Sequence, residues 1–392
     1  MEGPLKGVRI IDLTHAVAGP MATMILADQG ADVIKVEPPH TGDLARSQGA
    51  GPNGLSPIFV SVNRNKRSIA IDLKTSRGTE LLKRMVAGAN MFVQNFRPGK
   101  IEQMGLGESE LRKYRPDLVY VSISGFGQSG PYVKKRSYDP IIQALSGLAE
   151  IQADRASRRP QMVRVIVADK VAALSAAQAM TAALFHQAKT GHGQHVRLAM
   201  LDALVAFLWP EGMARFTFAE SSEEPDPDAP DLVFETQDGW ITVATNTDVE
   251  WRALARAVGH PEWIDDPRFK TPQLRVKNAG ERRAMLSRVL KTKPSAHWLS
   301  VLEAAEVPCA PVLSRAEMLL DPQVRANELV MNLSHPCAGR IRQARPAARF
   351  DRTPASIYRP APLLGEHTDE VLGELGLSAD EIAELRRERV IP

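Results

Sequence analysis

The fold of the chain is decided by Val8–Pro39, which reads VRIIDLTHAVAGPMATMILADQGADVIKVEPP. Its first part, Val8–Leu13, is a mostly apolar run that predicts a short buried strand. Helical spacing of apolar residues follows over Met21–Asp28, and Gly30 stands where a C-cap glycine is expected. A second apolar run over residues 31–36 predicts another strand. The stretch therefore predicts a β-α-β unit, the building block of parallel sheets.

The same alternation of strand and helix continues through the first half of the chain. Runs at Ser68–Leu73, Asn90–Val93 and Leu118–Ser124 predict strands, and Thr75–Ala87 predicts a helix. Strands that alternate with helices favour a parallel sheet with helices on its faces, which is an α/β architecture. Three further elements are expected: an alanine-rich helix over Lys170–Lys189, a strand over Gln194–Leu198 and a helix over Asp202–Trp209.

Acidic residues and prolines interleave over residues 220–231, which predicts an extended, poorly packing linker. This linker separates a large domain, residues 1–219, from a smaller α+β domain, residues 232–330. The smaller domain opens with Asp238-Gly239, a turn signal between two strand-like runs, and continues with helical patterns.

Composition excludes several classes of protein. The 392 residues carry a formal net charge of +3 with acids and bases interspersed, so no nucleic-acid surface is expected. Hydrophobic residues make up 44%, yet no apolar stretch reaches the roughly 18 residues of a membrane span. The two cysteines, Cys309 and Cys337, have no metal-ligand spacing, so no metal is expected. The N-terminus lacks the apolar core of a signal peptide, which favours a cytoplasmic protein.

The segment Gly125–Gly130, GFGQSG, matches the G-x-G-x-x-G pattern of dinucleotide sites and follows a predicted strand. Pro131 and the basic stretch after it disfavour the long helix that such a site requires. The first β-α turn, residues 16–20, is where this fingerprint normally lies, and it lacks the pattern. Two interpretations remain open: a loop that lets the backbone approach a ligand, and an ordinary surface turn.

Asp169 ends the strand-like run Val165–Asp169, directly before the alanine-rich helix. Aspartate is a favoured N-cap, so the simplest interpretation is a side chain that caps this helix. The alternative is a catalytic carboxylate, because a strand-to-helix junction presents side chains at the sheet edge where α/β proteins bind ligands. An ionised carboxylate needs no base to act as a nucleophile. Both interpretations remain open at this point.

Two more candidates follow predicted strands. His15 is a possible base or ligand, although single histidines at strand ends are more often structural. Arg97 lies in the loop over residues 95–99, and its planar guanidinium suits a phosphate. The alternative for Arg97 is an exposed arginine without a function.

Taken together, these segments resemble one family, the family III CoA-transferases. The family includes formyl-CoA and carnitine CoA-transferases and, as a divergent branch, alpha-methylacyl-CoA racemases. The resemblance runs nearly end to end, and the order and spacing of its motifs make it specific. The matching segments are Gly7–Leu13, Ala18–Pro20, Leu26–Glu37, Asn63–Ser68, Gln94–Gly99, Gly125–Gly127, Gly130–Tyr132, Tyr138–Pro140, Asp169, Pro308–Val312 and Pro362–Thr368.

The resemblance implies a fold, an assembly and ligands. The family fold is a ring-like chain with a Rossmann-like large domain, here residues 1–219, which the C-terminal return over residues 331–392 completes. Two such rings interlock into a homodimer. The substrates implied are an acyl-CoA and a small carboxylic acid, with no tightly bound cofactor.

The resemblance also implies roles for residues that match the family's motifs. Asp169 falls at the position of the nucleophilic aspartate, which favours the catalytic interpretation, and it can cap its helix as well. Backbone N–H groups of Gly125, Gly127 and Gly130 are candidates to stabilise oxyanions. The expected CoA contacts are His15, Val17 and Ala18, then Ile71, Asp72, Leu73 and Lys74 near the adenine and ribose, then Asn95, Phe96 and Arg97, and finally Arg136, Tyr138 and Asp139 near the pantetheine and thioester.

The implied reaction is CoA transfer from an acyl-CoA to a free carboxylic acid. The Asp169 carboxylate attacks the thioester to give an acyl-aspartyl anhydride, CoA thiolate converts it to an aspartyl-CoA thioester, and the acceptor acid reverses the sequence. Tyr138 stands where the racemase branch has a histidine, which favours transfer over racemisation. A racemase-like isomerase and a non-catalytic CoA-binding protein remain the alternatives.

Two departures from the family bear on the substrate. Formyl-CoA transferases carry a glycine-only loop before the small domain, whereas this chain has the acidic linker and Thr245–Thr247. Val17 also replaces a glutamine of those enzymes. The site is therefore expected to take a larger or less polar acid than formate or oxalate, and succinyl-CoA, an abundant thioester, is a reasonable donor.

Overall fold

The computed structural model describes residues 2–154, 157–220 and 231–392. The chain divides into two compact units, which are Met1–Glu224 together with Glu328–Pro392, and Pro225–Asn327. Residues 221–230, most of the predicted linker, lie outside the described residues. The C-terminal segment belongs to the large unit.

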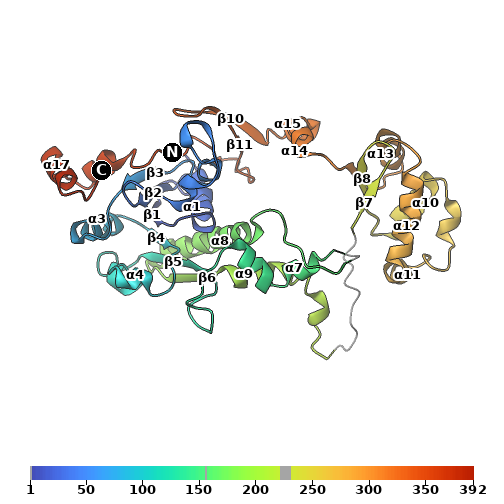
Figure 1. The fold of residues 1–392 in the computed structure, drawn as a ribbon, viewed down its shortest axis with the longest axis horizontal. Coiled ribbons are helices and arrows are strands. Elements are labelled where there is room, and N and C mark those ends of the chain that lie inside the picture. Colours follow the sequence, from blue (N-terminus) through green and yellow to red (C-terminus); the bar gives the residue numbers. More distant parts are fainter. Residues whose placement is uncertain (1, 155–156, 221–230) are drawn as a thin grey trace. The chain divides into compact units, whose positions relative to one another are not determined.

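A six-stranded parallel sheet forms the centre of the large unit, which confirms the predicted α/β architecture (Figure 1). Its strands are β1 (Arg9–Leu13), β2 (Asp32–Glu37), β3 (Arg67–Ala70), β4 (Met91–Gln94), β5 (Val119–Ser124) and β6 (His195–Ala199). The strand order is β3-β2-β1-β4-β5-β6, and every neighbouring pair is parallel. This order reverses between β1 and β4, and open α/β sheets bind ligands at such a point.

Helices cover both faces of the sheet. Side chains of alternate strand residues point to opposite faces and pack against the helices on each side. The helices of the large unit are α1 (Ala18–Asp28), α2 (Pro57–Val62), α3 (Ser76–Ala87), α4 (Lys100–Gln103), α5 (Glu108–Leu111), α6 (Asp139–Leu145), α7 (Leu148–Ile151), α8 (Val167–Thr190), α9 (Met200–Leu208), α16 (Thr368–Glu374) and α17 (Ala379–Arg387). Ile10 and Val33 belong to the core that includes α1, α8 and α9. Ile11 and Ile34 belong to the opposite core, with α3, α16 and α17. Both faces are buried, which explains the nearly continuous apolar runs of the strands.

The C-terminal segment packs beside β3, far from it in sequence. The His367 N–H donates to the Ser68 carbonyl at 2.9 Å, and Arg67 forms ion pairs with Glu370 and Glu374 of α16. The segment begins with an antiparallel hairpin of β10 (Val330–His335) and β11 (Gly339–Ala344). The large unit is therefore built from both ends of the chain.

The small unit combines an antiparallel sheet with helices. Its elements are β7 (Val233–Glu235), β8 (Trp240–Val243), α10 (Asp248–Ala257), α11 (Pro272–Lys277), α12 (Ala279–Leu290), α13 (Ser295–Ala304), β9 (Cys309–Pro311), α14 (Arg315–Met318) and α15 (Pro322–Ala326). The Asp238-Gly239 turn joins β7 to β8, as the sequence predicts. Trp251, Trp263 and Trp298 lie in its core. Across the described residues of both units, every helix is too short or too polar to span a bilayer.

Charged side chains are buried beside the central strands. Lys66 Nζ lies 2.9 Å from Asp12 Oδ2, and both side chains are fully buried. Lys66 also donates to the Pro20 carbonyl and to the Asn63 side chain. Burial opposes ionisation of Asp12, yet Lys66 and Lys35 hold the pKa of this carboxyl well below its usual value. Breaking such a pair is costly, because the remaining charge stays buried without its partner.

We expect Lys66→Met to lower the free energy of unfolding of the large unit by about 3–5 kcal/mol, because it leaves the buried Asp12 carboxylate without its ion-pair partner. The matched control is Lys113→Met, which removes an exposed ion-pair partner of Glu110 and is expected to change stability little. Scanning calorimetry that resolves the transitions of the two units measures both effects. Equal losses in the two variants would contradict the role of the buried pair.

Candidate active site

A cleft of about 410 Å³ opens at the carboxyl ends of β1, β4 and β5, where the strand order reverses. This is the position at which open parallel sheets bind ligands. The cleft brings together many of the residues selected from the sequence. They are His15, Asn95, Phe96, Arg97, Gly125, Gly127, Arg136 and Tyr138.

Asn95 joins the loops that follow β1 and β4. Its Oδ1 accepts the His15 N–H at 3.0 Å, and its Nδ2 donates to the His15 carbonyl at 2.8 Å. The ring of Phe96 lies against the imidazole of His15, with 5.3 Å between centroids. Burial lowers the pKa of His15 below its usual 6.5, so the imidazole is neutral at pH 7. The amide of Asn95 therefore shapes the wall of the cleft by holding two loops together.

The cleft is positively charged. Arg97, Lys100, Lys135 and Arg136 contribute to its lining, which contains no acidic side chain. Among the described residues, none forms an ion pair with Arg97, Lys100 or Arg136, whereas Lys135 lies over the ring of Tyr132. Guanidinium and ammonium groups without internal partners suit the phosphates of a ligand.

Asp169 does not cap α8, so the prediction of an N-cap was wrong. The helix begins at Val167 without a preceding strand, which places Asp169 within its first turn. The carboxylate of Asp139 takes the capping role, because its Oδ2 accepts the N–H groups of Ala168 at 2.7 Å and of Asp169 at 3.2 Å. Asp139 begins α6 and is itself buried. The cap thus comes from another helix, and the Asp169 side chain is left for a different contact.

The carboxylate of Asp169 contacts the N-terminus of α1. Its Oδ1 accepts the Ala18 N–H at 3.2 Å. Small side chains on both helices allow this approach, since Ala22 of α1 and Ala172 of α8 lie in one core. Gly19 is required here, because a Cβ on it would lie 2.5 Å from the Cβ of Thr14. The helix α1 begins at Ala18 and not at the predicted Met21, so the N–H of its first residue reaches Asp169.

The environment of Asp169 makes ionisation less favourable. Burial raises the pKa of its carboxyl from 3.8 to about 6, and the negative charge of Asp139 adds to this effect. The single hydrogen bond from Ala18 opposes the shift. The group remains mostly ionised at pH 7 but is poorly solvated.

Lys35 and Asp43 hold the loop between β1 and α1, and neither was predicted from the sequence as part of the site. Ala16 has a left-handed backbone with φ +66°, and its N–H donates to Asp43 Oδ1 at 2.8 Å. Lys35 forms an ion pair with Asp43 at 2.7 Å and donates to the Thr14 carbonyl at 2.8 Å. The available signal was Lys35 itself, a lysine between the apolar residues Ile34 and Val36 inside a buried strand.

Several expected CoA contacts lie outside the cleft. Ile71, Asp72, Leu73 and Lys74 follow β3 at the edge of the sheet, where the Asp72 N–H donates to the Val390 carbonyl. Asp169 itself does not line the cleft, and neither do Val17, Ala18 and Asp139. Ala18 and Asp139 both contact Asp169.

The glycine segment serves mainly local structure. The N–H of Gly127 donates to Ser124 Oγ at 3.1 Å, so it is not available to an oxyanion. Gly125 is required by close packing, since a Cβ on it would lie 2.1 Å from Ser137 Oγ. Gly130 lies outside the cleft lining. Of the three glycines, Gly125 alone keeps its candidate role.

Within the described ranges, no three histidine, cysteine or acidic side chains group together as a metal site. The fold and the cleft define a parallel α/β protein with a basic cleft at its topological switch point. Residues 5–368 match the family model of CoA-transferase family III. The chain belongs to this family, and the prediction of an acyl-CoA:carboxylate CoA-transferase is confirmed.

Individual relatives support the same family. The chain is 37% identical over 378 residues to the succinyl-CoA:glutarate CoA-transferase of Mus musculus, which covers 95% of this chain and 86% of that protein. It is 33% identical to the formyl-CoA:oxalate CoA-transferase of Streptomyces avermitilis, with 100% of both chains covered. The solved structure of a CAIB/BAIF family protein from Brucella suis matches with a TM-score of 0.82 and 31% identity, over 96% of this chain and 100% of that chain.

The raised pKa of Asp169 makes the stability of the large unit depend on pH. Between 3.8 and about 6 the folded protein holds more protons on this group than the unfolded chain does. Stability therefore falls as pH rises through this window and stays reduced above it. We expect Asp169→Asn, which keeps an acceptor for Ala18, to raise the free energy of unfolding by about 1–3 kcal/mol near roughly pH 8 and to change it little near roughly pH 4.

Calorimetry of the parent and the variant at both pH values measures this difference. Asp202→Asn is the matched control, because Asp202 is an exposed acid in the first turn of α9. We expect no pH-dependent gain from the control. A loss of stability in Asp169→Asn at both pH values would show that the carboxylate stabilises the fold.

Proposed function

We propose that this enzyme moves CoA from an acyl-CoA to a free carboxylic acid through covalent intermediates on Asp169. The observation that carries the proposal is the setting of this carboxylate, which is partly buried, accepts one N–H from Ala18 and has a raised pKa. A poorly solvated carboxylate is a stronger nucleophile than the same carboxylate in aqueous solution. Because the pKa of about 6 lies below neutral pH, the group is ionised and needs no base.

The reaction consists of two exchanges at one carboxylate. An Asp169 oxygen bonds to the donor's carbonyl carbon, and the C–S bond breaks to leave a mixed anhydride and CoA thiolate. The thiolate attacks the aspartyl carbonyl, which releases the donor acid and leaves an aspartyl-CoA thioester. The acceptor carboxylate attacks that thioester and releases thiolate. The thiolate then attacks the acceptor carbonyl of the second anhydride, which yields the new acyl-CoA and free Asp169.

Each attack creates an oxyanion that needs hydrogen-bond donors. We assign the Ala18 N–H to the oxyanion on the aspartyl carbonyl, because it contacts this side chain and lies at the positive end of α1. A positioned backbone donor contributes on the order of 3 kcal/mol to such a step. Gly125, which lines the cleft, is the candidate donor for the oxyanion on the substrate carbonyl.

The cleft supports a position for CoA. Arg97 and Arg136 have the charge and the free donors to bind its phosphates. In this arrangement Tyr138 lies near the pantetheine, since the next residue, Asp139, contacts Asp169. The adenine and ribose extend toward residues 71–74, as the family resemblance implies.

We further propose succinyl-CoA as donor and a short dicarboxylate such as glutarate as acceptor. The mouse relative is named for these two substrates. Val17 agrees with an acid larger than formate or oxalate. A panel of acyl-CoA donors and acids, with product thioesters identified by mass spectrometry, tests this pair. Racemisation is not favoured, because it requires a proton-transferring partner where this chain has Tyr138.

We also propose that two ring-like chains interlock into a homodimer. The large unit exposes a set of large apolar side chains that a second copy would cover. They are Leu174 and Phe185 of α8, Phe207 of α9, and Trp209 and Phe218 after it, with exposed fractions from 43% to 77%.

Covalent capture tests the chemical role of Asp169. We expect hydroxylamine, added during turnover with succinyl-CoA, to convert the activated Asp169 to a hydroxamate that mass spectrometry detects in its peptide. Asp169→Asn removes the nucleophile and is expected to abolish both the adduct and transfer, whereas Asp202→Asn retains both. Transfer by Asp169→Asn at the parental rate would refute the mechanism.

The pH dependence of kcat/KM tests the ionisation of Asp169. Activity is expected to rise with pH through about 6, because the carboxylate must be ionised to attack. Asp139→Asn keeps an oxygen that caps α8 but removes a negative charge, so the pKa of Asp169 falls and the rise moves to lower pH. An unchanged midpoint in this variant would mean that the profile reports another group.

A further inference from the structure

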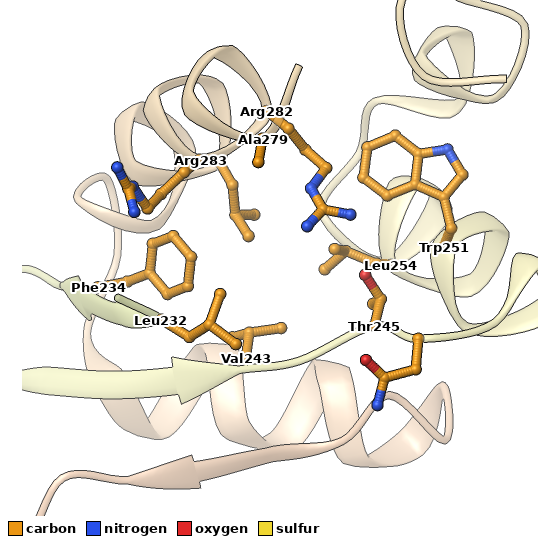
Figure 2. A pocket seen from close by; sticks show the side chains of 11 residues that line it. Leu232, Phe234, Val243, Thr245, Trp251, Leu254, Ala279, Arg282 and Arg283 are labelled. Atoms are coloured by element: carbon orange, nitrogen blue, oxygen red, sulfur yellow. The ribbon is translucent and has the colours of Figure 1, made fainter. Parts of the chain in front are cut away.

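The small unit contains a cavity of its own, of about 100 Å³, between its sheet and the helices α10 and α12 (Figure 2). Most of its wall is apolar. Phe234, Val243, Trp251, Leu254 and Leu286 line it, and each is at least nine-tenths buried. No step proposed for Asp169 uses this cavity.

Two arginines of α12, Arg282 and Arg283, line this cavity, and Arg283 donates to the Asp231 carbonyl at 3.5 Å. Arg282 of α12 directs its guanidinium into the cavity, toward Thr245 (Figure 2). The side chain is partly buried and pairs with no carboxylate among the described residues. The nearby Arg275 is already paired with Asp248. Burial and the positive charge of Arg275 lower the pKa of Arg282, so its charge is held in an unfavourable setting.

We infer that this cavity binds a short-chain aliphatic carboxylate. The carboxylate supplies the missing counterion, because a guanidinium pairs with it through two parallel N–H bonds. The hydroxyl of Thr245 lies on the same side and provides one more donor. The alkyl chain of the acid packs against the apolar wall, whereas a bare phosphate or sulfate would leave this wall uncovered.

The size of the cavity limits the chain length. A cavity of roughly 150 Å³ holds benzene, so one of about 100 Å³ takes an acid of about three to five carbons. Butyrate satisfies both requirements, charge and length. The neutral amide butyramide matches its shape but lacks the charge.

Photoaffinity labelling of the full-length protein tests the site. The probe is azipentanoate, a five-carbon acid whose diazirine replaces one methylene, and labelled peptides are located by mass spectrometry. We expect labelling of peptides from residues 232–290, competed by butyrate and not by butyramide. Because the small and large units give separate peptides, any labelling at Asp169 is distinguished from labelling here.

Two arginine variants on the same helix make the test specific. Arg282→Met is expected to lower labelling of the small unit at least about ten-fold, since a charge-assisted pair is lost. Arg288→Met, an exposed arginine on α12, is expected to leave it unchanged. Arg282→Lys, which keeps the charge, is expected to restore part of the labelling and guards against misfolding. Equal labelling of parent and Arg282→Met, equal competition by butyramide, or labels confined to the large unit would overturn the inference.

Discussion

The buried ion pair between Lys35 and Asp43 is the interaction on which the candidate active site depends. Asp43 accepts the Ala16 N–H with its second oxygen, and Lys35 donates to a carbonyl of the same loop, so the pair holds this loop at two points. The contacts keep Ala16 in a left-handed conformation, which costs on the order of 1–3 kcal/mol in a residue that has a Cβ. That loop leads to Ala18, the donor to Asp169. Because buried ion pairs add little net stability, we assign this one to fixing the strained loop.

Side-chain hydrogen bonds continue this support across the carboxyl edge of the sheet. The loops after β1 and β4 lie at the point where the strand order reverses, and Asn95 bonds the second loop to the His15 backbone. Gln94 then accepts the Phe96 N–H and donates to Ser122 of β5. These hydrogen bonds connect the ends of three strands that border the cleft, and Arg97 stands on one of the loops that they hold.

The sequence predicts much of this fold, because apolar periodicity along Val8–Pro39 records the local structure directly. It predicts the cleft less completely, because contacts between distant residues leave no periodic signal. Asp169 shows the limit: an aspartate before an alanine-rich stretch is typical of an N-cap, yet the cap is Asp139, thirty positions earlier. Lys35 and Asp43 were missed for the same reason, since their pairing exists only once the loop after β2 has folded back.

Capping of α8 by Asp139 has a direct consequence for the chemistry. If Asp169 were the N-cap, its oxygens would accept N–H groups of its own helix, which lowers the pKa of a carboxyl and weakens it as a nucleophile. Asp139 satisfies those N–H groups instead, and its charge raises the pKa of Asp169. One buried acid therefore completes the helix and, by the same contact, leaves Asp169 with a single hydrogen bond to its side chain among the described residues. The carboxylate whose ionisation is made unfavourable by this environment is the one that we propose as the nucleophile.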